Sequence, residues 1–384
     1  IVGSGAIGLE MLENFNRLGI ETKVVEMKEL INPNLDMDMS KLLSKKLRDK
    51  GVDLRLSSEV TEISKDGVKL AGGEILEAQL VLMATGVKPN INLAKEAGIT
   101  IGVSGAIEVD EFMRTSDENI YAVGDCAETY DSITGKKVYR PLGSTANKMG
   151  RICGDVITGG TMSYRGNIGT GIFRVFDLSA GTTGLSEREA REAGYNIEIV
   201  HMTKPDRPPY QGGRDMVIKA IADVESRQLL GVQIVGYEGV DKRLDVFVTL
   251  ISLKGSADDL FHLDLAYSPP FSTTKDPVHY VGMVLSGSSS MISSEELLQQ
   301  ENVQLVDARS LSDYENRGHL PGALHIPHQK LREQLESLNK DETVVVYCNS
   351  GTTGNAVLNL LKNRGFKRVF NLSGGNELYQ NTKK

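Results

Sequence analysis

The first 83 residues place apolar and polar positions in the order expected of alternating strands and helices. Short apolar stretches at 1–2, 22–26 and 79–83 predict strands, and helical spacing predicts helices near 6–18 and 37–50. A strand, a glycine turn, a helix and a second strand in succession indicate a βαβ unit. Further short strands are predicted at 53–56, 59–63 and 68–70.

The pattern changes at residue 85, where glycine-rich loops replace the regular elements. Only one strand, at 120–123, and one helix, beginning near Ala146, are predicted before residue 160, which indicates a different domain. Beyond residue 166, strand-like stretches surround a short helix, and this mixture indicates an α+β layer. The predicted strands are 171–175, 197–201, 216–222 and 228–235, and the predicted helices are 188–193 and 240–253.

The segment Gly287-Ser288-Ser289-Ser290 is predicted to be a linker, because glycine and serine neither bury apolar area nor stiffen the backbone. After it, short apolar strands at 303–307, 343–347 and 368–371 alternate with helical segments, as in a small parallel α/β domain. We therefore expect an α/β protein. Its predicted domains cover 1–84, 85–165, 166–284 and 291–384, with a linker at 285–290.

The amino-acid composition argues against several classes of binding partner. The 51 acidic and 43 basic residues give a net charge of -8, which argues against binding to nucleic acid or to an anionic membrane. No apolar run approaches the roughly 20 residues of a membrane-spanning helix. Three scattered cysteines match neither a disulfide framework nor a metal site, so we expect no metal and a cytoplasmic protein.

The motif Gly3-Ser4-Gly5-Ala6-Ile7-Gly8 lies between the first predicted strand and the first predicted helix. In that context Gly3 permits a tight turn, Gly5 lets the backbone approach a pyrophosphate, and Gly8 allows close helix packing. The helix N-terminus, which includes Ala6 and Ile7, adds positive potential for the phosphates. The alternative is a structural turn between strand and helix.

Glu26 ends the second predicted strand, where an acidic residue accepts hydrogen bonds from both ribose hydroxyls and repels a 2′-phosphate. This favours NADH over NADPH. Lys28, two residues further on, would soften that preference and leaves NADPH open as a cofactor, although a solvated surface lysine is the simpler interpretation.

Beyond this motif the chain resembles the pyridine nucleotide-disulfide oxidoreductases, which are flavoproteins with two dinucleotide sites. Ala84-Thr85-Gly86-Val87-Lys88-Pro89-Asn90 is similar to the segment with which the chain leaves the NAD domain in that family. Asn119-Ile120-Tyr121-Ala122-Val123-Gly124-Asp125 is similar to its second flavin motif. The resemblance implies FAD as a cofactor, held through Gly86, Gly124 and Asp125.

The same resemblance covers Pro141-Leu142-Gly143-Ser144-Thr145-Ala146-Asn147, which starts a helix whose amino end, with Ser144 and Ala146, points at the flavin ring in the family. Family members place their first flavin motif, and in several subfamilies a redox cysteine, ahead of the NAD domain. This chain begins at Ile1 with nothing before it, so we expect a fragment with a partial FAD-binding domain. Cys126 and Cys153 match no redox cysteine and are interpreted as packing residues.

Two tyrosine motifs refine the resemblance. Pro209-Tyr210-Gln211-Gly212-Gly213 and Ala266-Tyr267-Ser268-Pro269-Pro270 are similar to dimerisation-domain motifs of coenzyme A-disulfide reductases and of related NADH oxidases and persulfide reductases. The resemblance implies a homodimer in which the tyrosines of one subunit reach the active site of the other and donate protons to a sulfur substrate. The alternative is that either tyrosine is an aromatic core residue.

The last domain resembles rhodanese over residues 291–380. Val306-Asp307-Ala308-Arg309 and Gly318-His319-Leu320-Pro321-Gly322-Ala323 match its opening signature, and Val345-Val346-Tyr347-Cys348 matches the strand that ends in its nucleophile. Loop amides and the following helix, expected from about Asn355, would favour the Cys348 thiolate and a persulfide anion. Thr353 stands where active relatives usually carry arginine.

These features predict an FAD- and NAD(P)H-dependent reductase of coenzyme A disulfide or of a coenzyme A persulfide or polysulfide. Tyr210, Tyr267 and Cys348 are its candidate catalytic residues, and Cys348 would handle sulfane sulfur. One alternative is an NADH oxidase or peroxidase with the same motifs. Another is a dimerising NAD-binding module without redox activity.

Overall fold

The structure is a computed structural model that describes residues 1–287 and 290–383. The chain forms two compact units, one made of Ile1–Met83 with Ile172–Lys384, and the other made of Ala84–Gly171. Of the expected linker, Ser288 and Ser289 lie outside the described residues. Helix α8 (Pro277–Ser286) extends over the first two residues of that linker, because its apolar residues pack on the neighbouring sheet.

The amino-terminal part of the first unit contains the predicted βαβ elements. The parallel strands β1 (Lys23–Val25) and β2 (Asp53–Arg55) follow the helices α1 (Ala6–Arg17) and α2 (Met37–Asp49). Apolar faces of both helices are buried, as their helical spacing predicts. The predicted strand at 79–83 is reduced to one bridge between Met83 and Val2, which also bridges Val25, because Val2 alone offers no run of residues for a ladder.

A small antiparallel sheet lies beside this part. It consists of β3 (Val60–Ser64), β4 (Gly67–Leu70) and β5 (Ile75–Leu76), and its buried face contacts Val25 at the end of β1.

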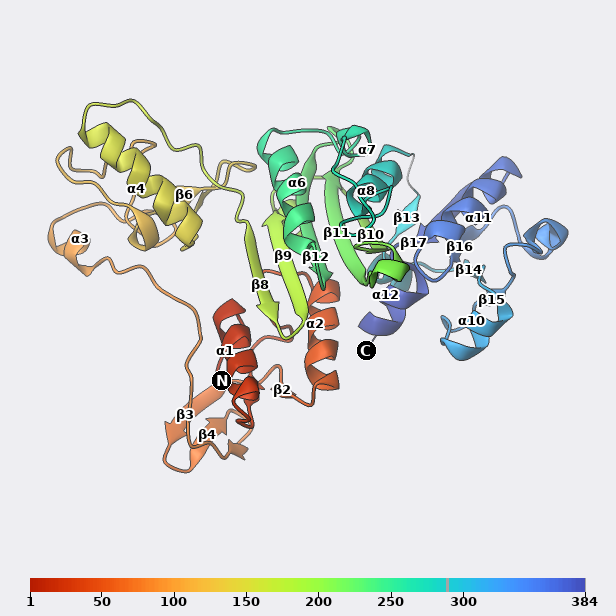
Figure 1. The fold of residues 1–384 in the computed structure, drawn as a ribbon, viewed down its shortest axis with the longest axis horizontal. Coiled ribbons are helices and arrows are strands. Elements are labelled where there is room, and N and C mark those ends of the chain that lie inside the picture. Colours follow the sequence, from red (N-terminus) through yellow and green to blue (C-terminus); the bar gives the residue numbers. More distant parts are fainter. Residues whose placement is uncertain (288–289, 384) are drawn as a thin grey trace. The chain divides into compact units, whose positions relative to one another are not determined.

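A five-stranded antiparallel sheet forms the centre of the first unit (Figure 1). Helices α6 (Val240–Ser252) and α8 pack against it, and α5 (Glu187–Glu192) starts at a complete capping box on Ser186. One of the strands, Leu178–Gly184, was not predicted, because its two glycines and short side chains give no alternating pattern. In spatial order the strands are β10 (Ile197–Pro205), β11 (Asp215–Asp223), β12 (Leu229–Gly236), β9 (Leu178–Gly184) and β8 (Gly171–Val175).

The carboxyl-terminal part is a parallel sheet in the order β13-β17-β16-β14-β15, flanked by helices. Its three main strands have the predicted positions within one residue. Helix α11 begins at Thr352, three residues before the predicted start, because Gly351 with φ 94° ends the preceding loop. The elements are β13 (Met291–Ile292), α9 (Ser294–Leu298), β14 (Val303–Asp307), α10 (Leu311–Asn316), β15 (Leu324–His325), β16 (Thr343–Tyr347), α11 (Thr352–Asn363), β17 (Arg368–Leu372) and α12 (Gly375–Thr382).

The second unit is built mainly from loops around one long helix, α4 (Gly143–Ile157). Cys153 lies on the buried face of α4, where burial raises the pKa of its thiol, and Cys126 packs against the same core. Both therefore pack as predicted. Among the described residues, the predicted strand at 120–123 is reduced to the single bridge Arg114–Tyr121, which is too short to form a ladder. The remaining elements are α3 (Asn92–Glu96), η1 (Gly124–Cys126), β6 (Thr129–Tyr130) and β7 (Lys137–Val138).

Within the part of the chain that the structure describes, no helix combines the length and apolar character needed to cross a bilayer.

Candidate functional site

The glycine turn before α1 has the geometry that a dinucleotide requires. Gly3 has φ 100°, a backbone conformation that side chains rarely adopt, and Gly5 is the N-cap of α1. A Cβ on Gly8 would lie 2.2 Å from the Gly3 carbonyl oxygen, so no larger residue fits there. Ala6 and Ile7 form the first turn of α1, with its N–H groups open to a phosphate. These residues fit a bound NAD cofactor.

Glu26 lies beside that turn and is 8 % exposed. Its Oε2 accepts hydrogen bonds from the backbone N–H of Ser4 at 2.9 Å and from Ser4 Oγ at 2.7 Å. Its Oε1 accepts from the backbone N–H of Lys28 at 2.9 Å. Strand β1 thus delivers a carboxylate to the glycine turn, where ribose hydroxyls would meet it.

In the second unit, four of the five residues expected at the flavin lie together at the start of α4. Gly124 has φ 76°, and a Cβ there would lie 3.5 Å from the Cβ of Ala146 in the first turn of that helix. Asp125 is exposed beside it, and Ser144 belongs to the same turn of α4. An exposed carboxylate next to a helix N-terminus fits part of a flavin site. Gly86, with φ 95°, lies in the segment that opens this unit.

Tyr210 and Tyr267 lie on two surface loops of the first unit. Tyr210 is 75 % exposed within η2 (Pro209–Gln211), and Tyr267 is 49 % exposed in the loop after α7 (Asp259–His262). Neither side chain is a core residue in this chain. Their exposure leaves both phenols available to a second copy of the protein.

Arg243 on α6 holds the two tyrosine loops. The guanidinium is 1 % exposed, and its Nη2 donates to the Asp206 carbonyl oxygen at 2.8 Å, at the start of the Tyr210 loop. The same nitrogen contacts the Asp276 carboxylate at 2.9 Å and Ser272 Oγ at 3.2 Å, at the end of the Tyr267 loop. Burial favours protonation of Asp276, but Arg243 and Ser272 outweigh it and hold the pKa of Asp276 below its ordinary value.

Cys348 directly follows β16 and is 5 % exposed. Its Sγ accepts the backbone N–H of Gly351 at 3.1 Å, just before the first residue of α11. The carbonyl oxygens of Cys348 and Asn349 accept the N–H groups of Asn376 and Glu377 in the first turn of α12, which fixes the loop from behind. The sulfur is therefore held by a backbone donor at the N-terminus of α11.

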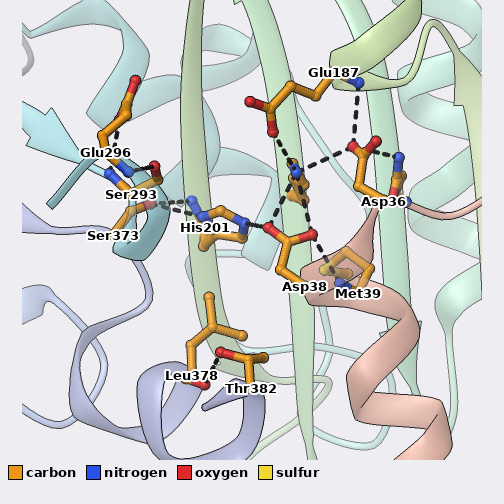
Figure 2. Close-up of polar contacts among 12 residues, drawn as sticks. Asp36, Asp38, Met39, Glu187, His201, Ser293, Glu296, Ser373, Leu378 and Thr382 are labelled. Carbon is orange, nitrogen blue, oxygen red and sulfur yellow. Dashed lines mark hydrogen bonds and ion pairs between the residues drawn. The ribbon is translucent and has the colours of Figure 1, made fainter. Parts of the chain in front are cut away.

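A buried polar cluster connects the three parts of the first unit (Figure 2). Lys219 on β11 is 1 % exposed, and its Nζ lies 3.1 Å from Asp36, 3.0 Å from Asp38 and 2.9 Å from Glu187. Burial works against the ammonium, but these carboxylates outweigh it and hold the pKa of Lys219 above its ordinary value. Burial likewise favours protonated Asp38, but Lys219 and His201 hold the Asp38 pKa below its usual range.

His201, directly opposite Lys219 in the register of β10 and β11, extends the cluster to the carboxyl-terminal domain. Its Nε2 lies 2.7 Å from Asp38 Oδ2, at the start of α2 (Figure 2). Its Nδ1 lies 2.9 Å from Ser373 Oγ, and its backbone N–H donates to the same oxygen at 2.7 Å. One strand residue thus contacts the amino-terminal and carboxyl-terminal parts at once.

Sequence reasoning missed Lys219, His201 and Arg243. A signal existed for Lys219, which interrupts an apolar strand, because a charge in a buried strand requires partners. The identity of those partners could not be predicted, because Asp38 and Glu187 are far from Lys219 in the sequence. Among residues 1–287 and 290–383, no group of three or more His, Cys, Asp or Glu residues is arranged to hold a metal ion.

Family models match three segments of the chain. The pyridine nucleotide-disulphide oxidoreductase model matches residues 1–149, its dimerisation-domain model matches 172–277, and the rhodanese-like domain model matches 293–382. A NAD-dependent persulfide reductase from A. fulgidus has a similar structure, with a TM-score of 0.89 and 40 % identity over 98 % of this chain and 71 % of that one. The chain belongs to the pyridine nucleotide-disulphide oxidoreductases.

Two further family members are similar over long segments. The reduced Bacillus anthracis CoADR-RHD structure matches with a TM-score of 0.95 and 33 % identity, over 99 % of this chain and 70 % of that one. The NAD(P)H coenzyme A polysulfide/persulfide reductase of Pyrococcus horikoshii is 39 % identical over 297 residues. That alignment covers 74 % of this chain, and the chain spans 65 % of the length of this relative.

Proposed function

We propose that the protein acts in the NAD(P)H-dependent, FAD-linked reduction of coenzyme A disulfide, persulfide or polysulfide, and that its rhodanese-like domain carries sulfane sulfur on Cys348. The observation that carries this proposal is the Cys348 loop, in which a backbone N–H contacts the sulfur at the start of α11. The names of the relatives from A. fulgidus and Pyrococcus horikoshii support a persulfide or polysulfide substrate.

The chain's own residues have distinct roles in this proposal. Bound NADH and FAD would supply a hydride and an electron relay, with NADPH as a weaker alternative to NADH. The glycine turn and Glu26 would orient the nicotinamide nucleotide, and the Asp125 carboxylate would hold part of the flavin chain. Tyr210 and Tyr267 would donate protons to the sulfur leaving group in the partner subunit.

The proposal includes a homodimer and a cytoplasmic location. A dimerisation domain and two exposed tyrosines support the first, and three free cysteines suit a reducing compartment. Light scattering at micromolar concentration should give the mass of two chains. A monomer would remove the basis for the role of the tyrosines.

Cys348 provides the direct test. After limited labelling with iodoacetamide near neutral pH, mass spectrometry should show Cys348 modified faster than Cys126 and Cys153. Equal rates would mean that Cys348 is not activated and would refute the sulfur-carrying role. In a flavin-loaded preparation, NADH-dependent turnover should be faster with coenzyme A persulfide or disulfide than with O₂, whereas the reverse order would indicate an NADH oxidase.

A further inference from the structure

Lys204 reaches the Cys348 loop from outside the rhodanese-like domain. It lies on β10, and its Nζ donates to Thr352 Oγ1 at 2.7 Å, at the first residue of α11. The ammonium also lies 4.4 Å from the ring centroid of Tyr280 on α8. The five-stranded sheet that contains β10, called the dimerisation sheet below, therefore places a cation at the helix end where the Cys348 sulfur is held.

The cation of the rhodanese-like domain that contacts this loop, Arg309, is already paired. Arg309 approaches it, with Nη1 at 3.4 Å from Asn349 Oδ1, but its charge is committed to Asp307. The pair is buried, with 2.6 Å between Arg309 Nη2 and Asp307 Oδ2. Thr353, in the first turn of α11, carries no charge. An anionic ligand at Cys348 would find no unpaired guanidinium in either position.

The charge of Lys204, in contrast, is not committed. Among residues 1–287 and 290–383, its ammonium contacts Thr352 Oγ1 and the Tyr280 ring, and no carboxylate forms an ion pair with it. Burial lowers the pKa of Lys204, electrostatic interactions with Cys348 and Asp215 oppose that shift, and Lys275 adds to it. Lys204 contacts Thr352, and the Cys348 sulfur contacts the adjacent residue Gly351, so the ammonium and the sulfur lie at the same helix end.

We propose that Lys204 completes an anion site at Cys348, so that the dimerisation sheet supplies the positive charge needed to bind a donor with a negatively charged terminal sulfur. Persulfide anions and thiosulfate share this chemistry. The inference rests on the proposed function in taking Cys348 as the sulfur acceptor. It adds a residue from a different domain to that site and explains how the site tolerates Thr353.

Bonds, electrons and charge all balance in the proposed sulfur transfer. The Cys348 thiolate attacks the terminal sulfur of R–S–S⁻, a new S–S bond forms on Cys348, and the S–S bond of the donor breaks. The electron pair of that bond leaves with R–S⁻, so there is no net oxidation. Two negative charges are present before and after, and both gather beside Lys204, which attracts the donor and offsets their repulsion.

Two alkylating reagents of different charge separate the effects of Lys204. We expect Lys204→Met to slow labelling of Cys348 by the anion iodoacetate about five- to ten-fold, and by neutral iodoacetamide only about two- to three-fold. The ammonium would stabilise the attacking thiolate with both reagents, but it would attract only the anionic reagent. Lys204→Arg should keep both rates near those of the unaltered chain. Lys275→Met is the matched control, since Lys275 Nζ lies 5.3 Å from the centroid of the same Tyr280 ring. It should leave the labelling rates with both reagents unchanged.

A positive charge introduced at another position of the Cys348 loop should restore the iodoacetate rate lost in Lys204→Met. Thr353→Arg in the Lys204→Met background should restore most of the iodoacetate rate. If Lys204→Met leaves the ratio of the two reagents unchanged while Cys348 still reacts faster than Cys126 and Cys153, the inference is wrong and the proposed function stands. If Cys348 is not the fastest cysteine in the unaltered chain, the proposed function itself fails.

Ionic strength tests the same inference without substitution, should Lys204→Met prevent folding. In the unaltered chain, added salt should slow iodoacetate labelling of Cys348 more than iodoacetamide labelling, because screening weakens the attraction between Lys204 and the anion. Equal effects of salt on both reagents would overturn the assignment.

Discussion

The Glu26 carboxylate accepts hydrogen bonds from the glycine turn and is also the group proposed to bind the cofactor ribose. Ser4 and Lys28 donate three hydrogen bonds to it, so its position beside the glycine turn is set before any nucleotide binds. A preset carboxylate costs little to order when ribose hydroxyls arrive. The sequence motif predicted the neighbours of this residue but not the contacts with Ser4.

Glu26→Arg should shift cofactor preference toward NADPH, because a guanidinium pairs with a 2′-phosphate that the carboxylate repels. Titration with both nucleotides should show a lower ratio of NADPH to NADH dissociation constants than in the unaltered chain. Glu26→Gln is the control, since it removes the repulsion without adding a cation and should weaken NADH binding with a smaller change in the ratio. Preference for NADPH before any substitution would contradict the assignment.

Tyr267→Phe removes a proton donor and little else, because the side chain is half exposed and contributes little to the core. In a flavin-loaded preparation, reduction of the sulfur substrate should slow about ten-fold or more. Tyr195→Phe, which removes a hydroxyl from a partly exposed tyrosine after α5, should leave turnover unchanged. Normal turnover in Tyr267→Phe would exclude a role in proton transfer.

At the scale of elements, α6 does more than cover the sheet. Through Arg243 it ties the ends of the two loops that present Tyr210 and Tyr267. An element that carries no candidate catalytic residue thereby sets the positions of two. Because these contacts join segments far apart in the chain, no local pattern could reveal them.

Arg243→Met should loosen both loops together. Hydrogen exchange should accelerate in 206–214 and 263–276, since the Asp276 carboxylate loses its buried partner. Arg188→Met, on an exposed helix face, is the control and should change exchange in neither loop. Faster exchange in only one loop would show that Arg243 does not couple them.

The elements that the sequence predicted well are those whose own residues carry a strong pattern. Strand β16 is a mostly apolar, fully buried run of a parallel sheet, and both β14 and β16 were predicted at their observed bounds. The strands at 79–83 and 120–123 fail because a strand exists only when another segment pairs with it. Strand β9 was missed because its own residues have little strand propensity, and its pairing with β12 makes it a strand.

At the scale of the whole molecule, the Lys219 cluster joins α2, the central sheet and α5 through one ammonium. The low pKa of Asp38 contributes stability that is present above its unfolded pKa of about 3.9 and is lost as the pH falls. The raised pKa of Lys219 contributes stability below its unfolded pKa of about 10.4 that is lost at higher pH. The contributions of Asp38 and Lys219 are therefore both present between those limits.

Lys219→Met should destabilise the protein by about 3–5 kcal/mol at neutral pH, because three partly buried carboxylates lose the ammonium that they share. The deficit should shrink as the pH falls toward about 4 and those carboxylates take up protons. Urea unfolding followed by circular dichroism would measure it, since the chain has no tryptophan. Lys45→Met, which breaks an exposed ion pair on α2, should cost less than about 1 kcal/mol at any pH. A deficit independent of pH would show that lost packing, not charge, is responsible.

The hydrogen bond from the His201 backbone to Ser373 also has a consequence for solubility. Strand β10 is the outer strand of its sheet, and this bond uses one of the N–H groups that face away from β11. A chain ended at residue 287 would leave that border open to any extended segment, as in self-association through strand addition. The rhodanese-like domain would then act as a shield against aggregation, whether or not its cysteine carries sulfur.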